Sequence, residues 1–268
     1  MKREVRIAAW AAAGVLVSSL AVSAAPVGSD NLNYPDGPIA GRAGGTGWAA
    51  ERTDEPGAPP SSASDWDTLF GTANIVGGKL VTLESGAKRE YNGPSEGVTV
   101  PSNEREGAFR GTGSVFYGFD MTRVAGADWS GASSYDFDAE RIFYGVPSGQ
   151  GANAFFGIEE SGVGRSMSTV PVVNGQTYRV VAQLDFDNDK LNLWVDPTPA
   201  DLGTPDATRA YTGTNWSSAV RLASGGTGST TWDNVVVATD WSDPGLVPEP
   251  DVMWLGGIGA LALLRRRR

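Results

Sequence analysis

Three acidic side chains at alternate positions are the residues best placed for acid–base chemistry: Asp136, Asp138 and Glu140. Residues i, i+2 and i+4 of a β-strand project to one face, so a strand here would direct all three carboxyl groups to one side. Two carboxyl groups about 5 to 5.5 Å apart can hydrolyse a glycosidic bond, one as nucleophile and one as acid and base. The alternative, which we expect, is a solvated turn followed by a strand in which Arg141 forms an ordinary ion pair.

A second acidic run lies between two expected strands. Asp185, Asp187 and Asp189 imitate the start of a calcium loop, because Ca²⁺ prefers carboxylate oxygens at such spacing. The sixth position is Lys190, however, where an EF-hand requires glycine, and an Asx-rich hairpin turn explains the same residues without a metal. We expect the turn, with a Ca²⁺ site as the alternative hypothesis.

Two tryptophans are candidates for sugar binding. Trp129 and Trp216 lie among Gly, Ser and Asn residues, which predicts exposed rings on which a sugar face could stack. Trp194 lies in an apolar run and is expected to be buried.

The residue types that the chain lacks exclude several kinds of chemistry. The 268 residues include no histidine and no cysteine. Ser-His-Asp and Cys-His catalysis, histidine-containing zinc sites, thiolate nucleophiles and disulfides are therefore excluded. The formal charge of -10 argues against a nucleic-acid partner, because phosphate binding requires clustered Lys and Arg.

The N-terminus has the three parts of a secretory signal. Basic residues at 2, 3 and 6 precede an apolar run over 7–22, and small residues follow at 23–25. The sequence predicts a signal peptide over 1–24 that the secretion machinery and a signal peptidase recognise. An uncleaved anchor helix is the alternative.

The C-terminus combines a short motif, a short apolar segment and a basic end. The motif is Val247, Pro248, Glu249 and Pro250. The apolar segment covers 252–264, about 20 Å as a helix and thus shorter than a hydrocarbon core of about 30 Å. The chain closes with Arg265, Arg266, Arg267 and Arg268, which would hold this end on the cytoplasmic side. This order predicts a sorting signal with a short transmembrane helix rather than a permanent anchor.

The charge divides unevenly between these segments. Residues 1–24 carry a net +2 and residues 249–268 a net +2, whereas residues 25–248 hold 14 basic and 28 acidic side chains, a net -14. The strong negative charge of residues 25–248 favours solubility and opposes binding to anionic lipids and polyanions. We expect one folded domain over 25–242, followed by a linker and the sorting signal over 243–268.

The body contains short runs of β-branched and aromatic residues separated by Gly, Pro, Asn, Asp and Ser, a pattern typical of an antiparallel sandwich or barrel. Gly77-Gly78 predicts a two-residue hairpin turn. Alternation over 178–184 predicts one face in the core. The expected strands cover 73–76, 79–83, 107–110, 114–121, 140–146, 154–159, 165–170, 177–185, 191–196, 219–223 and 234–239.

Residues 26–60 are rich in Gly and Pro, yet they include Tyr34 and Trp48, which are costly to leave in a linker. We expect an ordered irregular edge packed on the sandwich. Residues 240–247 are expected to form the linker to the sorting signal.

Two resemblances rest on these residues. The C-terminus resembles the PEP-CTERM signal of bacterial exosortase substrates, through Pro248-Glu249-Pro250, the apolar segment and the arginines. Residues 30–242 resemble the concanavalin A-like lectin/glucanase (LamG-like) jelly rolls of bacterial surface proteins, through Asn33-Tyr34-Pro35-Asp36-Gly37-Pro38, Gly44-Gly45-Thr46-Gly47-Trp48, the hairpin 178–197 and Trp232-Asp233-Asn234-Val235-Val236-Val237.

The resemblances imply an all-β jelly-roll sandwich of two antiparallel sheets. They imply export across the inner membrane, transient anchoring, processing near Pro248-Glu249-Pro250 by an exosortase-type membrane transpeptidase, and display at the cell surface or in the extracellular matrix. Asp138 and Glu140 also stand in places that match the catalytic Glu-x-Asp-x-Glu strand of the glucanases, with Asp136 where the nucleophilic glutamate would be.

We expect a non-catalytic surface protein that binds extracellular polysaccharide and needs no cofactor unless Ca²⁺ binds. The alternatives are a glycoside hydrolase that uses Asp138 and Glu140, and a structural surface module without a small ligand.

Overall fold

The computed structural model describes residues 26–48, 65–91, 109–110, 112–136, 139–151, 153–213, 216–243 and 245–247. The predicted signal peptide, the predicted membrane segment and the four terminal arginines lie outside these residues. Within them, no helix has the length and apolar character needed to cross a membrane.

Most of the described residues belong to two antiparallel sheets. The nine-stranded sheet contains β1 (Gly28–Asp30), β2 (Gly37–Pro38), β4 (Asn74–Val76), β5 (Lys79–Thr82), β8 (Ser114–Arg123), β13 (Thr177–Asp185), β14 (Lys190–Val195), β15 (Ala207–Ala210) and β18 (Thr230–Ala238). The seven-stranded sheet contains β3 (Asp67–Phe70), β6 (Ser85–Glu90), β9 (Ala127–Asp136), β10 (Ala139–Val146), β11 (Phe155–Glu160), β12 (Gly164–Pro171) and β17 (Ala219–Gly226). Smaller elements are the pair β7 (Phe109–Arg110) and β16 (Trp216–Ser217) and the 3₁₀ turn η1 (Asp201–Gly203).

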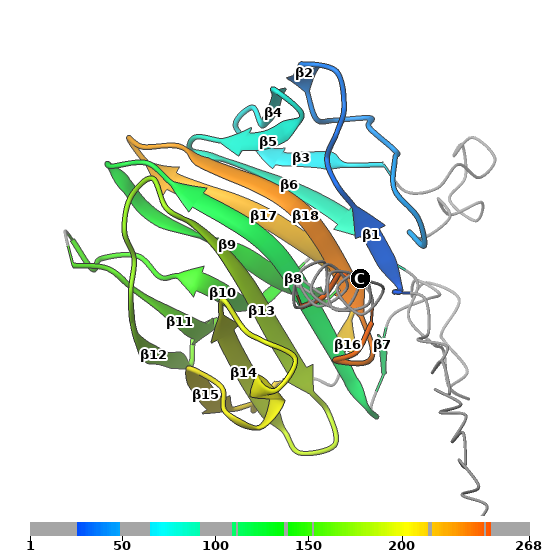
Figure 1. Ribbon diagram of the computed structural model, residues 1–268, viewed down its shortest axis with the longest axis vertical. Coiled ribbons are helices and arrows are strands. Elements are labelled where there is room, and N and C mark those ends of the chain that lie inside the picture. The colour runs from blue at the N-terminus through cyan, green and yellow to red at the C-terminus, as the bar shows by residue number, and fades with distance from the viewer. Residues whose placement is uncertain are drawn as a thin grey trace, which may run out of the picture.

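The chain passes repeatedly from one sheet to the other (Figure 1). The nine-stranded sheet has the order β15-β14-β13-β8-β18-β5-β4-β2, with β1 beside β18, and the seven-stranded sheet has the order β12-β11-β10-β9-β17-β6-β3. Consecutive strands such as β5 and β6, β8 and β9, or β17 and β18 therefore lie in different layers. This connectivity is the predicted jelly-roll sandwich.

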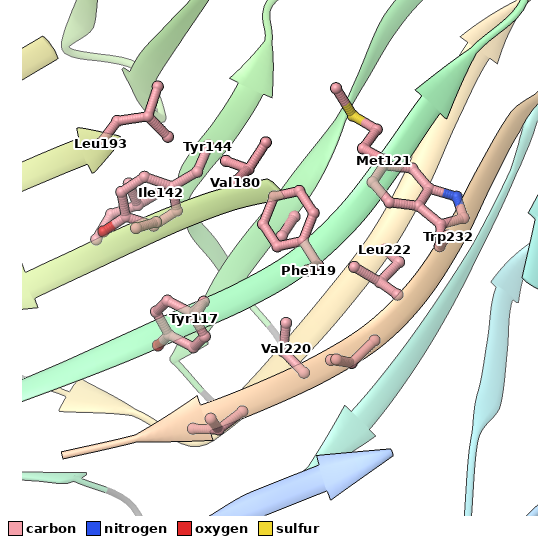
Figure 2. Packing of buried hydrophobic residues seen from close by; sticks show 14 of the residues in the cluster. Tyr117, Phe119, Met121, Ile142, Tyr144, Val180, Leu193, Val220, Leu222 and Trp232 are labelled. Carbon is pink, nitrogen blue, oxygen red and sulfur yellow. The ribbon is translucent and has the colours of Figure 1, made fainter. Parts of the chain in front are cut away.

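The core lies between the two sheets and arises from strict alternation along the strands. On β13, Tyr178, Val180, Ala182 and Leu184 all enter the core, which confirms the alternation predicted from the sequence. Figure 2 shows the aromatic ring of Phe119 beside Trp232 and near Leu222 of the opposite sheet. The Gly77-Gly78 turn between β4 and β5 is also confirmed, since both residues have positive φ angles, +60° and +75°.

A buried ion pair organises the irregular N-terminal segment. The Asp30 carboxylate accepts hydrogen bonds from Arg89 Nη1 at 2.5 Å, Tyr34 Oη at 2.5 Å and Trp66 Nε1 at 2.9 Å. The Arg89 guanidinium lies over the Trp48 ring, 4.4 Å from its centroid. Burial lowers the pKa of Arg89, and the charge of Asp30 opposes that shift. Residues 26–48 are thus packed on the sandwich, as the sequence predicts, whereas the remainder of the predicted edge, 49–60, lies outside the described residues.

The chain after β18 forms a short strap over the outer face of the nine-stranded sheet, here called the C-terminal strap (239–243 and 245–247). Leu246 and Val247 are buried with Trp241, whose ring lies 4.8 Å from that of Trp194. Arg179 donates hydrogen bonds to the carbonyl oxygens of Leu246 at 3.0 Å and of Gly245. The sequence places a linker here, whereas the structure packs these residues on the sheet, because they bury apolar side chains that the outer face of β13 and β14 would otherwise expose.

The Asp30 ion pair yields a stability prediction. Asp30→Asn leaves the Arg89 guanidinium buried without its carboxylate, and we expect a loss of about 3 to 5 kcal/mol in the free energy of unfolding, measured by urea denaturation. The control is Lys79→Met, which removes the exposed ion pair of Lys79 with Asp233 (2.9 Å) and should cost less than about 1 kcal/mol. Equal losses for the two variants would contradict the assigned role of Asp30.

The same cluster makes stability depend on alkaline pH. Burial, followed by the hydrogen bond to Asp30, raises the pKa of Tyr34 to about 12. Because the folded pKa is above the unfolded value of 10.0, this contribution is fully present below pH 10 and is lost as the pH rises toward about 12. Urea midpoints measured across this range should fall more steeply for the natural chain than for Tyr34→Phe, and parallel slopes would show that Tyr34 does not contribute.

The strap should loosen when Arg179 is replaced. Arg179→Met removes charged donors from two strap carbonyl groups, so amide hydrogen exchange over 240–247 should accelerate by at least about tenfold. Exchange in β10 on the opposite sheet serves as the internal control. Unchanged exchange in the strap would show that apolar packing alone holds it.

Candidate functional site

The candidate site is an open groove on the outer face of the seven-stranded sheet. Phe143 and Arg221 point outward there, because their neighbours Ile142 and Leu222 enter the core. The groove has a cavity volume of about 470 Å³. Its lining residues are Phe70, Asp128, Trp129, Glu140, Phe143, Pro147, Ser148, Glu159, Ser161 and Arg221.

A row of three aromatic rings crosses the groove. The Trp129 ring lies 6.2 Å from that of Phe70 and 6.0 Å from that of Phe143, the latter in an edge-to-face arrangement. Phe70 is 37% exposed and Trp129 is half-buried, whereas Phe143 is only 9% exposed. The row therefore offers apolar ring surface to a ligand while its inner end is fixed by packing.

Glycines on neighbouring strands let these rings approach the sheet closely. A Cβ atom at Gly225 of β17 would overlap the Trp129 indole, and one at Gly131 of β9 would lie 2.5 Å from Phe143 Cζ. Glycine inside a strand is typical of such a close approach. The floor of the groove is thus backbone, covered by aromatic side chains from adjacent strands.

A polar cluster lies beside the aromatic row. Arg221 of β17 donates from Nη1 to Tyr135 Oη at 3.0 Å and from Nη2 to Ser133 Oγ at 2.8 Å, and it forms an ion pair with Glu140. Ser133 Oγ in turn donates to Glu140 Oε1 at 2.7 Å. Three adjacent strands therefore meet in one network of charge-assisted hydrogen bonds.

The Arg221 guanidinium also contacts two aromatic faces, with its central carbon 5.9 Å from the Trp129 centroid and 5.5 Å from the Tyr135 centroid. Burial raises the pKa of Tyr135, although the positive charge of Arg221 opposes that shift. The Tyr135 hydroxyl therefore stays protonated near neutral pH. The cation and the Phe143 ring therefore both pack against Trp129 and help to hold it in place.

Asp136 and Glu140 do not share one strand, so the one-strand hypothesis for the acidic triplet is wrong, whereas the strand expected over 140–146 is present as β10. Asp136 is the last residue of β9 and Ala139 is its antiparallel partner at the start of β10, which carries Glu140. Asp138 lies outside the described residues. Glu140 is bound to Arg221 and Ser133 and also borders the groove.

The aspartates of the predicted calcium loop lie in the tight turn between β13 and β14. Asp185 accepts hydrogen bonds from the backbone and side-chain nitrogens of Asn188, and Asp187 accepts one from the Gly113 amide. Asp189 has a φ angle of +49°, a left-handed conformation that aspartate tolerates in turns. Within the described part of the chain, no three Asp or Glu residues gather into a group that could hold a metal ion, these aspartates included.

The tryptophans predicted from the sequence separate in space. Trp129 lines the groove, whereas Trp194 is buried beneath the C-terminal strap. Trp216 pairs with Arg110 through its backbone, and its side chain lies outside the described residues, as do Pro248, Glu249 and Pro250. Sequence reasoning did not single out Arg221, Phe70 or Phe143, although the recurrent strand glycines were a usable signal for close ring packing.

A second cavity of about 630 Å³ lies between β1 and the C-terminal strap. Its charged residues are engaged in holding the fold: Asp30 binds Arg89, and Arg179 binds the strap and Asp120 at 3.1 Å. The groove on the seven-stranded sheet is the stronger candidate, since it combines exposed rings with polar groups that face the solvent.

Comparisons with solved structures give distant similarities. A sialidase has a TM-score of 0.45 at 12% identity, over 67% of this chain but only 18% of the sialidase. The alginate lyase AlgAT5 from Polysaccharide Lyase family 7 has a TM-score of 0.41 at 10% identity, over 62% of this chain and 81% of that one. The CBM2 module of the evolved Dit protein of Lactobacillus casei BL23 phage J-1 has a TM-score of 0.40 at 12% identity, over 63% and 79%. Similarities at this level carry no argument about ligand or activity.

No curated protein matches the chain in sequence. One family model does match, and it covers residues 246–268. Its first two residues, Leu246 and Val247, are the buried end of the C-terminal strap. The chain therefore ends in a PEP-CTERM protein-sorting motif, the signal of an exported protein processed by exosortase.

Proposed function

We propose that this protein is a non-catalytic polysaccharide-binding protein of the cell surface or extracellular matrix. In this proposal the signal peptide directs export, a signal peptidase removes it, and an exosortase-type transpeptidase processes the chain near Pro248-Glu249-Pro250. The single observation that carries the binding role is the row of Phe70, Trp129 and Phe143 across an open groove with a polar cluster beside it. Sugar rings stack on aromatic faces, and their hydroxyl groups hydrogen-bond to adjacent polar atoms.

The surroundings of Glu140 support a non-catalytic role. Its Oε1 atom accepts hydrogen bonds from both Arg221 and Ser133, and those contacts fix the side chain in the wall of the groove. A retaining glycosidase needs a carboxylate nucleophile and a carboxylic acid at the glycosidic bond, whereas Glu140 uses its Oε1 atom in an ion pair with Arg221 that belongs to the wall of the groove. Hydrolysis of a polysaccharide by Asp138 and Glu140 remains the alternative function. A measurement of released reducing ends detects it.

Removing the central ring should weaken binding. Trp129→Ala takes away the stacking surface, and we expect the affinity for a soluble polysaccharide to fall by at least about tenfold in isothermal titration calorimetry. The matched control is Trp241→Phe in the C-terminal strap, which should bind like the natural chain, and urea midpoints should show that both variants fold.

Three outcomes of this experiment contradict the proposal. Binding that survives Trp129→Ala would place the sugar elsewhere, and an absence of binding to every polysaccharide would favour a structural module. Release of reducing ends by the natural chain, abolished by Glu140→Gln, would show a glycoside hydrolase.

A further inference from the structure

The charges that line the groove restrict the polysaccharides it can accept, an inference that rests on the proposed function. Among the lining residues of the groove, the positive charge is that of Arg221. Its side chain is 9% exposed, and both terminal nitrogens are bound within the protein, to Tyr135 and to Ser133 and Glu140. The Nε atom of Arg221 is buried, so a carboxylate or sulfate on a ligand would have to displace these partners to bind the Arg221 guanidinium. Arg165, at the edge of the groove, is itself engaged with Glu159 and with the Ser148 carbonyl oxygen.

The acidic residues of the groove, unlike Arg221, each keep one oxygen atom that can accept a hydrogen bond from a ligand. Asp128, Glu140 and Glu159 each use one carboxylate oxygen in a contact with the protein: Asp128 Oδ1 with the Gly149 amide at 3.0 Å, Glu140 Oε1 with Arg221, and Glu159 Oε2 with Arg165 Nη2 at 3.2 Å. Within the described residues, the second oxygen of each has no hydrogen-bond donor. These oxygens accept hydrogen bonds and donate none.

A sugar hydroxyl supplies the donor that these oxygens lack. Hydrogen bonds from hydroxyl groups to carboxylates are short and strong, so an uncharged glycan stacked on Trp129 would satisfy them. A uronate or sulfate at the same place would face like charge in a groove with two more acidic than basic lining residues, on a body that carries a net -14 over residues 25–248.

We infer that the groove selects uncharged polysaccharides and rejects acidic ones, with Asp128, Glu140 and Glu159 as the residues that determine this specificity.

The test compares two soluble polymers, an uncharged β-glucan and the uronate polymer alginate, by calorimetry at low and high salt. The natural exported chain should bind the β-glucan at least about tenfold more tightly than alginate. The double variant Asp128→Asn, Glu159→Gln should bind the β-glucan more weakly. It should also lower the ratio of β-glucan affinity to alginate affinity by several-fold, most clearly at low salt, where charge repulsion is least screened. Glu140 is left intact because its ion pair supports Trp129.

The control removes the same number of charges from the other sheet, with Asp206→Asn and Asp233→Asn. This variant should keep the full preference, because its charges lie away from the groove. Alginate binding equal to or tighter than β-glucan binding in the natural chain, or equal effects of the two double variants, would overturn the inference and leave the binding function intact. If the natural chain binds neither polymer, nor any other polysaccharide, the proposed function itself fails.

Discussion

The buried ion pair between Asp30 and Arg89 is the interaction on which the N-terminal third of the described structure depends. Asp30 lies on β1, Arg89 on β6, and Trp66 immediately precedes β3, so one carboxylate joins both sheets to the irregular segment between them. A charge buried this deeply is tolerated only with its partner in place. Residues 26–48 are consequently part of the fold, despite a composition that is typical of linkers.

The core-facing direction of Arg89 on β6 is linked to which side chains lie on the outer face of the seven-stranded sheet. Because side chains alternate along β6, a core-facing Arg89 turns Lys88 outward, and the same rule on β17 turns Arg221 into the groove while Leu222 enters the core. The groove therefore occupies the outer face of the seven-stranded sheet. The C-terminal strap occupies the outer face of the nine-stranded sheet, so the groove and the segment that leads to the sorting motif lie on opposite faces.

Sequence patterns predicted the apolar strands, among them β10, β11 and β17 at the groove, but missed β9, which carries Trp129, and β6, which lies beside β17. The run over 177–185 was visible because β13 lies against the core on one face and beneath the strap on the other. The strands β6 and β9 were not expected, since their sequences, Ser-Gly-Ala-Lys-Arg-Glu and Ala-Asp-Trp-Ser-Gly-Ala-Ser-Ser-Tyr-Asp, are polar or small. A strand that forms the floor of a groove needs small residues beneath the ligand or the aromatic rings, and that need removes the hydrophobic signal.

Local chemistry was enough for features that depend on neighbouring residues: the sorting motif, the Gly77-Gly78 turn, the aspartate-rich turn at 185–189 and the antiparallel β class. Features that join distant residues required the tertiary structure, among them the packing of Trp129 on Gly225, the ion pair of Arg221 with Glu140, and the separation of Asp136 from Glu140 by a change of strand. The sequence contains the side chains of the groove, but the register between strands decides which of them meet, because a shift of one residue sends a side chain to the opposite face of the sheet.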